Sequence, residues 1–131
     1  MEVPLLVLAD YANVSIEGKL NILGIFSNVN ASALPFTLAQ MQIVFMLRYA
    51  PIERGQTKEV DVRLEGPDGE LLIGFKTTLP LPADAPLSGD VPQVISLNGL
   101  TFTRYGDHAL HVLVNGEPKA RVGFTVKPLE G

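Results

Sequence analysis

The sequence contains no cysteine and no tryptophan, and it has only two histidines. Without cysteine the chain can form no disulfide, no thiolate nucleophile and no thiolate-bound zinc or iron–sulfur site. Charged residues are scarce at 18%, and the 14 acidic residues outnumber the 10 basic ones, for a formal net charge of -4. Nucleic acid and anionic lipid are bound by clustered Lys and Arg, so we expect neither as a partner.

Long apolar runs are also missing. The apolar segment 3–9 is interrupted by Pro4, and the first lysine in the chain is Lys19. A signal peptide needs a basic segment followed by a longer apolar one, and a membrane span needs about 20 apolar residues. We therefore expect no membrane association and, with the lack of cysteine, a cytoplasmic location.

Hydrophobic residues are abundant, at 47% of the 131 residues. This length suits one domain over residues 1–131 with one ordinary hydrophobic core. The share of hydrophobic residues is high for a chain with so few charges, which predicts more apolar surface than a monomer of this size can bury.

Frequent turn signals and alternating patterns predict an all-β fold. Val60, Val62 and Leu64 alternate with polar residues, as in a strand with one buried face, and Asn115-Gly116 favours a tight hairpin turn. We predict an antiparallel Greek-key β-sandwich of immunoglobulin-like architecture, with eight or nine strands. The expected strands are 3–12, 19–30, 41–50, 57–65, 70–78, 92–98, 100–104, 107–115 and 119–127.

Three of these segments, 3–9, 20–26 and 41–49, are apolar on both faces. In a two-layer sandwich only one face of a strand meets the core, so the other must be covered by a loop, the N-terminal segment or another molecule. We predict that Leu6, Leu8, Val44 and Met46 form an interface. The opposite assignment, with these residues in the core, stays open because a one-residue slip exchanges the two faces.

The opening residues resemble the signature of an uncharacterised bacterial domain family of unknown function. The signature has a Leu-Ala-Asp tripeptide at the end of an apolar strand, here Leu8 to Asp10, and then Gly-Lys-Leu-Asn-Ile-Leu-Gly after a short turn, here Gly18 to Gly24. A central strand like Ile43 to Tyr49 and a closing hairpin like Leu110 to Val126 are also similar. The resemblance implies a bacterial or phage-derived β-sandwich and carries no catalytic residue.

No arrangement of residues indicates an enzyme. His108 and His111 are three apart in an expected strand and should point to opposite faces, and no nucleophile motif is present. Asp68, Asp84, Asp90 and Asp107 lie in expected loops, as calcium-binding sandwiches require, but they are scattered, and turns recruit Asp for backbone reasons. We expect no catalytic residue, no metal and no cofactor.

One polar group stands out within the apolar N-terminal segments. Asp10, Asn13 and Asn21 fall around the first expected turn, where buried polar groups need partners. We interpret them as a hydrogen-bonded cluster that fixes the first hairpin, and the alternative is a recognition site.

We therefore expect a non-enzymatic module for protein interaction or self-assembly, with a symmetric dimer as the simplest oligomer. The alternative is a sandwich that binds a small ligand or Ca²⁺ through its loops, with 79–91 and Tyr105 to Asp107 forming the mouth of a pocket. A hydrolase has no support beyond the presence of Ser, His and Asp.

Overall fold

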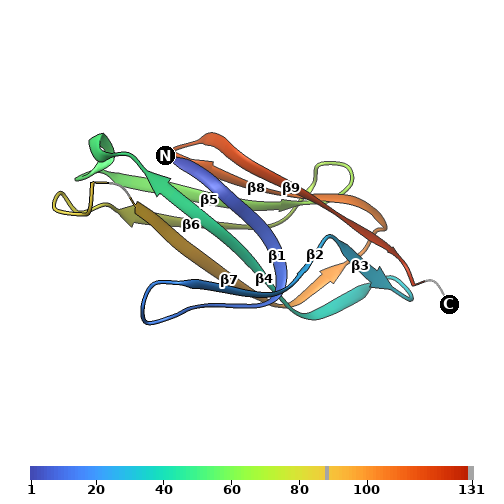
Figure 1. Ribbon diagram of the computed structural model, residues 1–131. Coiled ribbons are helices and arrows are strands. Elements are labelled where there is room, and N and C mark those ends of the chain that lie inside the picture. The colour runs from blue at the N-terminus through green and yellow to red at the C-terminus, as the bar shows by residue number, and fades with distance from the viewer. Residues whose placement is uncertain (88, 130–131) are drawn as a thin grey trace.

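The computed structural model describes residues 1–87 and 89–129, and these residues form two β-sheets stacked face to face (Figure 1). The expected all-β sandwich is confirmed, with nine strands among the described residues and one short 3-10 helix, Pro51–Glu53. The strands are β1 (Glu2–Val14), β2 (Leu20–Phe26), β3 (Asn28–Ala31), β4 (Phe36–Tyr49), β5 (Thr57–Glu65), β6 (Leu71–Pro80), β7 (Gly89–Phe102), β8 (Gly106–Val114) and β9 (Glu117–Pro128).

The first sheet has the order β2-β1-β4-β7 and the second the order β3-β9-β8-β5-β6. The predicted hairpins β5–β6 and β8–β9 are both present, and Asn115 and Gly116 both have the positive φ of a type I′ turn. One pair departs from the predicted antiparallel pattern, because β3 runs parallel to β9. The chain passes from one sheet to the other at Ser27 without reversing, so β2 fixes the direction of β3.

Two predicted divisions between strands were wrong, and the strand expected at 41–50 begins earlier, at Phe36. The segment 19–30, expected as one strand, is divided at Ser27 into β2 and β3, which lie in different sheets. The segments 92–98 and 100–104, expected as two strands, are one strand, β7, although Gly99 within it has a φ of 76°. A glycine with positive φ can sit in a strand as an irregularity without ending it.

The main core lies between the two sheets. Val60, Val62 and Leu64 of β5 point into it as predicted, and Phe45 and Phe102 are among its largest buried side chains. Because side chains alternate along a strand, the same pattern that fills this core leaves Arg63 and Glu65 of β5 on the outer face, partly exposed.

A second, smaller core covers the outer face of the first sheet. The β1–β2 hairpin turns back over this face, along β7 in Figure 1, and its Leu20 and Ile22 pack with Ala12, Val44 and Val94. The backbone N–H of Ala12 donates a hydrogen bond to Gln42 Oε1 over 2.8 Å, and Gln42 Nε2 donates to Ser96 Oγ over 3.0 Å. The N-terminal hairpin therefore covers the second apolar face of β4.

This arrangement corrects part of the interface predicted from the sequence. Leu8 is 1% exposed and lies in the main core, and Val44 is completely buried beneath the hairpin. Leu6 and Met46 are partly buried. Leu8 and Val44 thus cannot contact a partner while the hairpin and the sandwich are folded, since the chain itself covers both.

Candidate functional site

The predicted polar cluster divides into two parts. Asn21 Nδ2 donates a hydrogen bond to Asn13 Oδ1 over 3.0 Å, across the register of β1 and β2, and both residues are exposed. Asp10 does not join them. Alternation along β1 places its side chain on the opposite face of the hairpin from Asn13, where it lines a pocket.

We call this hollow the Asp10 pocket; its volume is about 230 Å³. Its polar lining consists of the Asp10 carboxylate and the carboxamides of Asn28, Asn30 and Gln40. Its apolar lining consists of Phe26, Val29 and Leu38. A concave site with an apolar floor and a few converging polar groups is the usual form of a small-ligand site.

Four strands meet at the Asp10 pocket, which explains why sequence reasoning found only one of its polar residues. Asp10 comes from β1, Phe26 from β2, the two asparagines from β3 and Gln40 from β4. Asn28 and Asn30 are two apart in a short strand, so they point to one side of it. The two-residue spacing of the asparagines indicates that they share a face, but it does not predict which other strands that face would lie against.

Gly24 makes room for the Asp10 carboxylate. It has a φ of 73°, and a Cβ added to it would lie 2.9 Å from Asp10 Cγ and closer still to Oδ2. Both residues belong to the signature described above, Asp10 to its first part and Gly24 to its second. The Asp10 carboxylate thus occupies space that only glycine at position 24 leaves free.

We expect Gly24→Ala to lower the free energy of unfolding by roughly 2 kcal/mol, from positive φ and from displacement of Asp10. Gly18→Ala is a matched control, because Gly18 has a similar φ of 82° and nothing within 4 Å of an added Cβ. Gly18→Ala should lower the free energy of unfolding by only about 1 kcal/mol. Urea denaturation of both variants measures the difference, and equal losses would show that the Asp10 contact adds nothing.

The opposite face of the hairpin is exposed and carries three large apolar side chains next to the Asn13–Asn21 pair. Tyr11, Leu23 and Ile25 are 48%, 69% and 62% exposed, and Tyr11 lies directly opposite Leu23 in the β1–β2 register. We call these three residues the hairpin face. They adjoin β2, which forms one edge of the first sheet. Large exposed apolar side chains that lie together are unusual on a monomer and mark contact surfaces.

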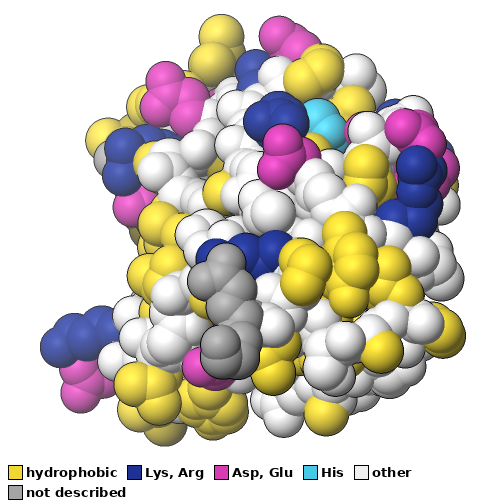
Figure 2. All heavy atoms as spheres, turned by 90° about the vertical axis from the view of Figure 1, so that its right-hand side faces the viewer, with side chains coloured by type: hydrophobic (Ala, Val, Ile, Leu, Met, Phe, Trp, Pro, Cys, Tyr) yellow, Lys and Arg dark blue, Asp and Glu magenta, His cyan; other side chains and the backbone are white. Residues whose placement is uncertain are grey.

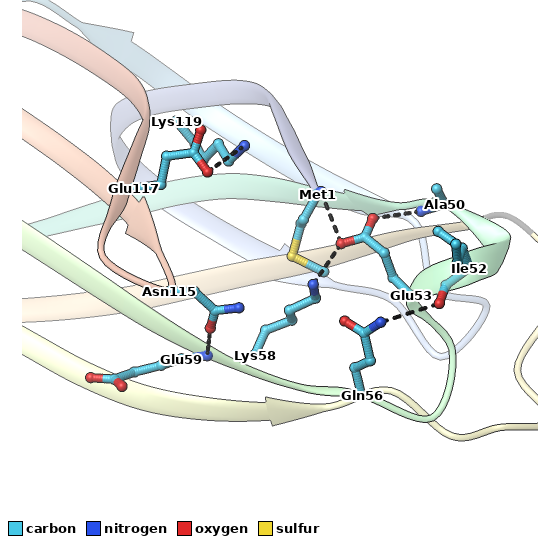
Figure 3. Close-up of polar contacts among 10 residues, drawn as sticks. All are labelled: Met1, Ala50, Ile52, Glu53, Gln56, Lys58, Glu59, Asn115, Glu117 and Lys119. Atoms are coloured by element: carbon cyan, nitrogen blue, oxygen red, sulfur yellow. Dashed lines mark hydrogen bonds and ion pairs between the residues drawn. The ribbon is translucent and has the colours of Figure 1, made fainter.

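A buried ionic cluster lies where β4 leads into the 3-10 helix (Figure 3). Glu53 Oε2 is 2.9 Å from the α-amino nitrogen of Met1 and 2.8 Å from Lys58 Nζ, while the Ala50 N–H donates to Oε1 over 2.9 Å. Burial alone would raise the pKa of Glu53, but the hydrogen bonds from Lys58 and Ala50 and the Met1 ammonium together lower this pKa to about 2. The cluster is fully paired, which indicates a structural role.

The two histidines lie apart, as the sequence indicated. His108 is 2% exposed and packs against the rings of Phe102 and Phe124, which also contact each other, and its Nδ1 lies 3.0 Å from the Gly106 carbonyl. His111 Nε2 lies 3.3 Å from a Glu65 carboxylate oxygen on the outer face.

The aspartates weighed as calcium ligands have separate surroundings. Asp68 pairs with Arg104, Asp90 pairs with Arg48, and Asp107 accepts a hydrogen bond from Thr125. Within the described parts of the chain, no three His, Asp or Glu side chains gather in a group that could hold a metal ion. None of the described residues forms a helix with the length and apolar character needed to cross a bilayer.

The two loops expected to form one pocket mouth do not meet. The segment 79–91, in which Ser88 lies outside the described residues, leads from the end of β6 into the start of β7, and the turn Tyr105 to Asp107 follows the end of β7. β7 extends from Gly89 to Phe102 without a break, so the loops lie at opposite ends of a strand roughly 45 Å long. The prediction of a shared mouth was wrong because it divided this strand into two.

No single charge sign dominates the face in Figure 2. Hydrophobic side chains reach this surface in several separate places, between groups of basic and acidic side chains. Such a mixed surface is typical of soluble domains and by itself identifies no ligand.

The fold also occurs in a solved structure, the Pseudomonas fluorescens alkylpurine DNA glycosylase AlkC bound to DNA containing an abasic site analog. The TM-score is 0.51 with 17% sequence identity, which shows a similar fold alone. The match covers 96% of this chain and 30% of that one, so this chain spans about a third of the length of that protein.

The search of curated proteins found no match to this chain. The family comparison did find one: the profile described as "Family of unknown function (DUF6941)" matches residues 4–127. That range contains both parts of the N-terminal signature, the Asp10 pocket and the hairpin face. The chain therefore belongs to the family of unknown function DUF6941.

Proposed function

We propose that this protein is a non-enzymatic interaction module, bacterial, cytoplasmic and immunoglobulin-like in strand arrangement, that pairs with a second copy of itself. The observation that carries the proposal is the hairpin face, where Tyr11, Leu23 and Ile25 are exposed beside an open sheet edge. This surface takes the place of the interface expected at Leu8 and Val44, which the chain buries.

The composition of β2 supports pairing at this edge. Natural sheet edges are usually protected by charge, proline or short length. The β6 edge carries Lys76 and ends at Pro80, the β7 edge contains Asp90 and Pro92, and the β3 edge has only four residues. β2, Leu20–Phe26, contains neither a charged residue nor a proline.

The absence of charge in β2 favours a second copy as the occupant. Two copies of β2 can pair antiparallel about a two-fold axis without placing like charges opposite each other. Backbone hydrogen bonds would then continue the first sheet across the dimer, and Leu23 and Ile25 of each copy would be buried from solvent in the interface.

Size exclusion with light scattering tests this proposal on the wild type and on Leu23→Glu. We expect the wild type at twice the chain mass of 14.1 kDa and the variant as a monomer. Leu71→Glu is the matched control, because Leu71 is 60% exposed on β6 and outside the hairpin, and it should remain dimeric. A wild-type monomer at all concentrations, or equal dissociation of both variants, would overturn self-association through this edge.

Small-ligand binding is the second candidate function, and the Asp10 pocket is the observation that favours it. The site proposed for the ligand differs from the loops expected from sequence, because the pocket is formed by strands of both sheets.

A further inference from the structure

The hydrogen-bonding side chains of the Asp10 pocket are one carboxylate and three carboxamides. The Asp10 carboxylate accepts hydrogen bonds only, and the carboxamides of Asn28, Asn30 and Gln40 each add one acceptor oxygen and one donor NH2 group. All four residues are exposed, so a ligand from solvent can reach them.

The charge of the pocket is negative. No Lys, Arg or His lines it, and among residues 1–87 and 89–129 no ion pair to Asp10 is present. The other two aspartates at this end of the sandwich differ, because Asp68 pairs with Arg104 and Asp107 accepts a hydrogen bond from Thr125. An unpaired carboxylate beside an apolar surface attracts a cation that also carries an apolar group.

The apolar floor of the pocket indicates that the ligand also carries an apolar group. Phe26 and Leu38 are partly buried and Val29 is 4% exposed, so the floor is anchored to the main core. A hollow of about 230 Å³ has room for a chain of a few methylene groups but not for a drug-sized molecule.

We propose that the Asp10 pocket binds an alkylammonium group, with the ammonium on the Asp10 carboxylate and the surrounding carboxamide oxygens and the alkyl chain on Phe26 and Leu38. An ammonium has three donors and no acceptor, so it can donate to the Asp10 carboxylate and to carboxamide oxygens, while the carboxamide NH2 groups bond to water. The group can come from a free aliphatic amine or from a lysine side chain of another protein. The proposal does not depend on self-association, because the pocket and the hairpin face lie on opposite faces of the hairpin.

The test is an NMR titration of the ¹⁵N-labelled protein with n-butylammonium, with lysine blocked at both its α-amino and carboxyl groups, and with n-butanol. We expect saturable shifts of the Asp10 and Gly24 amides with the two ammonium compounds, at roughly millimolar affinity, and none with the neutral alcohol. If butylammonium binds more tightly than the blocked lysine, the ligand is a free amine. If the blocked lysine binds equally tightly or more tightly, the ligand is a lysine side chain.

Asp10→Asn should weaken binding of both ammonium compounds at least tenfold, because it removes the charge and keeps the shape. Gly24→Ala should weaken it as well by displacing the carboxylate. Asp107→Asn is the control and should bind like the wild type, since Asp107 lies outside the pocket lining. Binding of n-butanol equal to that of butylammonium, undiminished binding by Asp10→Asn, or no saturable binding would overturn the proposal.

Discussion

Replacing Glu53 by Gln is expected to lower the free energy of unfolding by roughly 3 kcal/mol, because it leaves two buried cations without a counter-charge. Glu53 is 7% exposed and Lys58 is 8% exposed, and both Lys58 Nζ and the Met1 α-amino nitrogen lie within 3 Å of Glu53 Oε2. Truncating one partner of such a cluster is more damaging than the cluster is stabilising, since the remaining charges stay desolvated. Urea denaturation at neutral pH measures the loss.

Glu59→Gln is the matched control for this prediction. Glu59 lies one residue after Lys58, but its side chain is 58% exposed and its ion pair with Lys76 is 3.9 Å long. Exposed ion pairs of this kind contribute about 0–1 kcal/mol. If Glu53→Gln and Glu59→Gln lost the same stability, the buried cluster would contribute no more than a surface pair.

The same cluster predicts a pH dependence. The folded-state pKa of Glu53, about 2, lies below its ordinary value of 4.5, so the folded protein favours the ionised form. The stability from this group is therefore complete above about pH 4.5 and is lost as the pH falls towards 2 and below. The stability difference between the wild type and Glu53→Gln should shrink over this range, and a constant difference would contradict the assignment.

Val44→Asp is expected to lower the free energy of unfolding by roughly 4 kcal/mol, because it buries a carboxylate among apolar side chains. Val44 is completely buried, in contact with the small core formed by Ala9, Ala12 and the hairpin residues. The substitution weakens the contact between the hairpin and the sheet, so the Ala12 amide should also exchange its hydrogen faster than in the wild type. Denaturation and hydrogen exchange together measure both effects.

Met46→Asp is the comparison that isolates the hairpin. Met46 lies two residues along β4, on the same face as Val44, but it is only partly buried and lies outside the hairpin's small core. We expect Met46→Asp to lower the free energy of unfolding by less than about 1.5 kcal/mol and to leave the Ala12 amide protected from hydrogen exchange. A similar loss at both positions would show that the hairpin does not seal this face.

Individual strands were predictable because their signals are local. The alternation of Val60, Val62 and Leu64 and the Asn115-Gly116 turn depend on neighbouring residues, and both predictions are confirmed. The pairing of β3 with β9 joins residues almost a hundred positions apart, such as Asn28 and Thr125. No local pattern distinguishes that partner from the other strands, so neither its identity nor its parallel direction followed from the sequence.

The candidate site shows the same division. Asp10 was singled out because a charge at the end of an apolar strand is conspicuous, and the Asn13–Asn21 bond followed from hairpin geometry. The carboxamides that line the pocket with Asp10 come from β3 and β4. Sequence reasoning missed Asn28 and Asn30 because it placed 19–30 in a single strand, and it missed Gln40 because it began the next strand at 41. The alternation rule also could not decide which face of β4 was the core, since both faces are apolar.

By itself the sequence determined an all-β chain without thiol chemistry, the main turns and a surplus of apolar strand faces. Only the tertiary structure decided how that surplus is divided: Val44 is covered by the chain's own hairpin, while Tyr11, Leu23 and Ile25 remain exposed. It also decided that Asp10, Asn28 and Gln40 line one pocket with an apolar floor. The physical reason is that strand period fixes which residues share a face, whereas the element that covers the face is chosen by packing between distant segments.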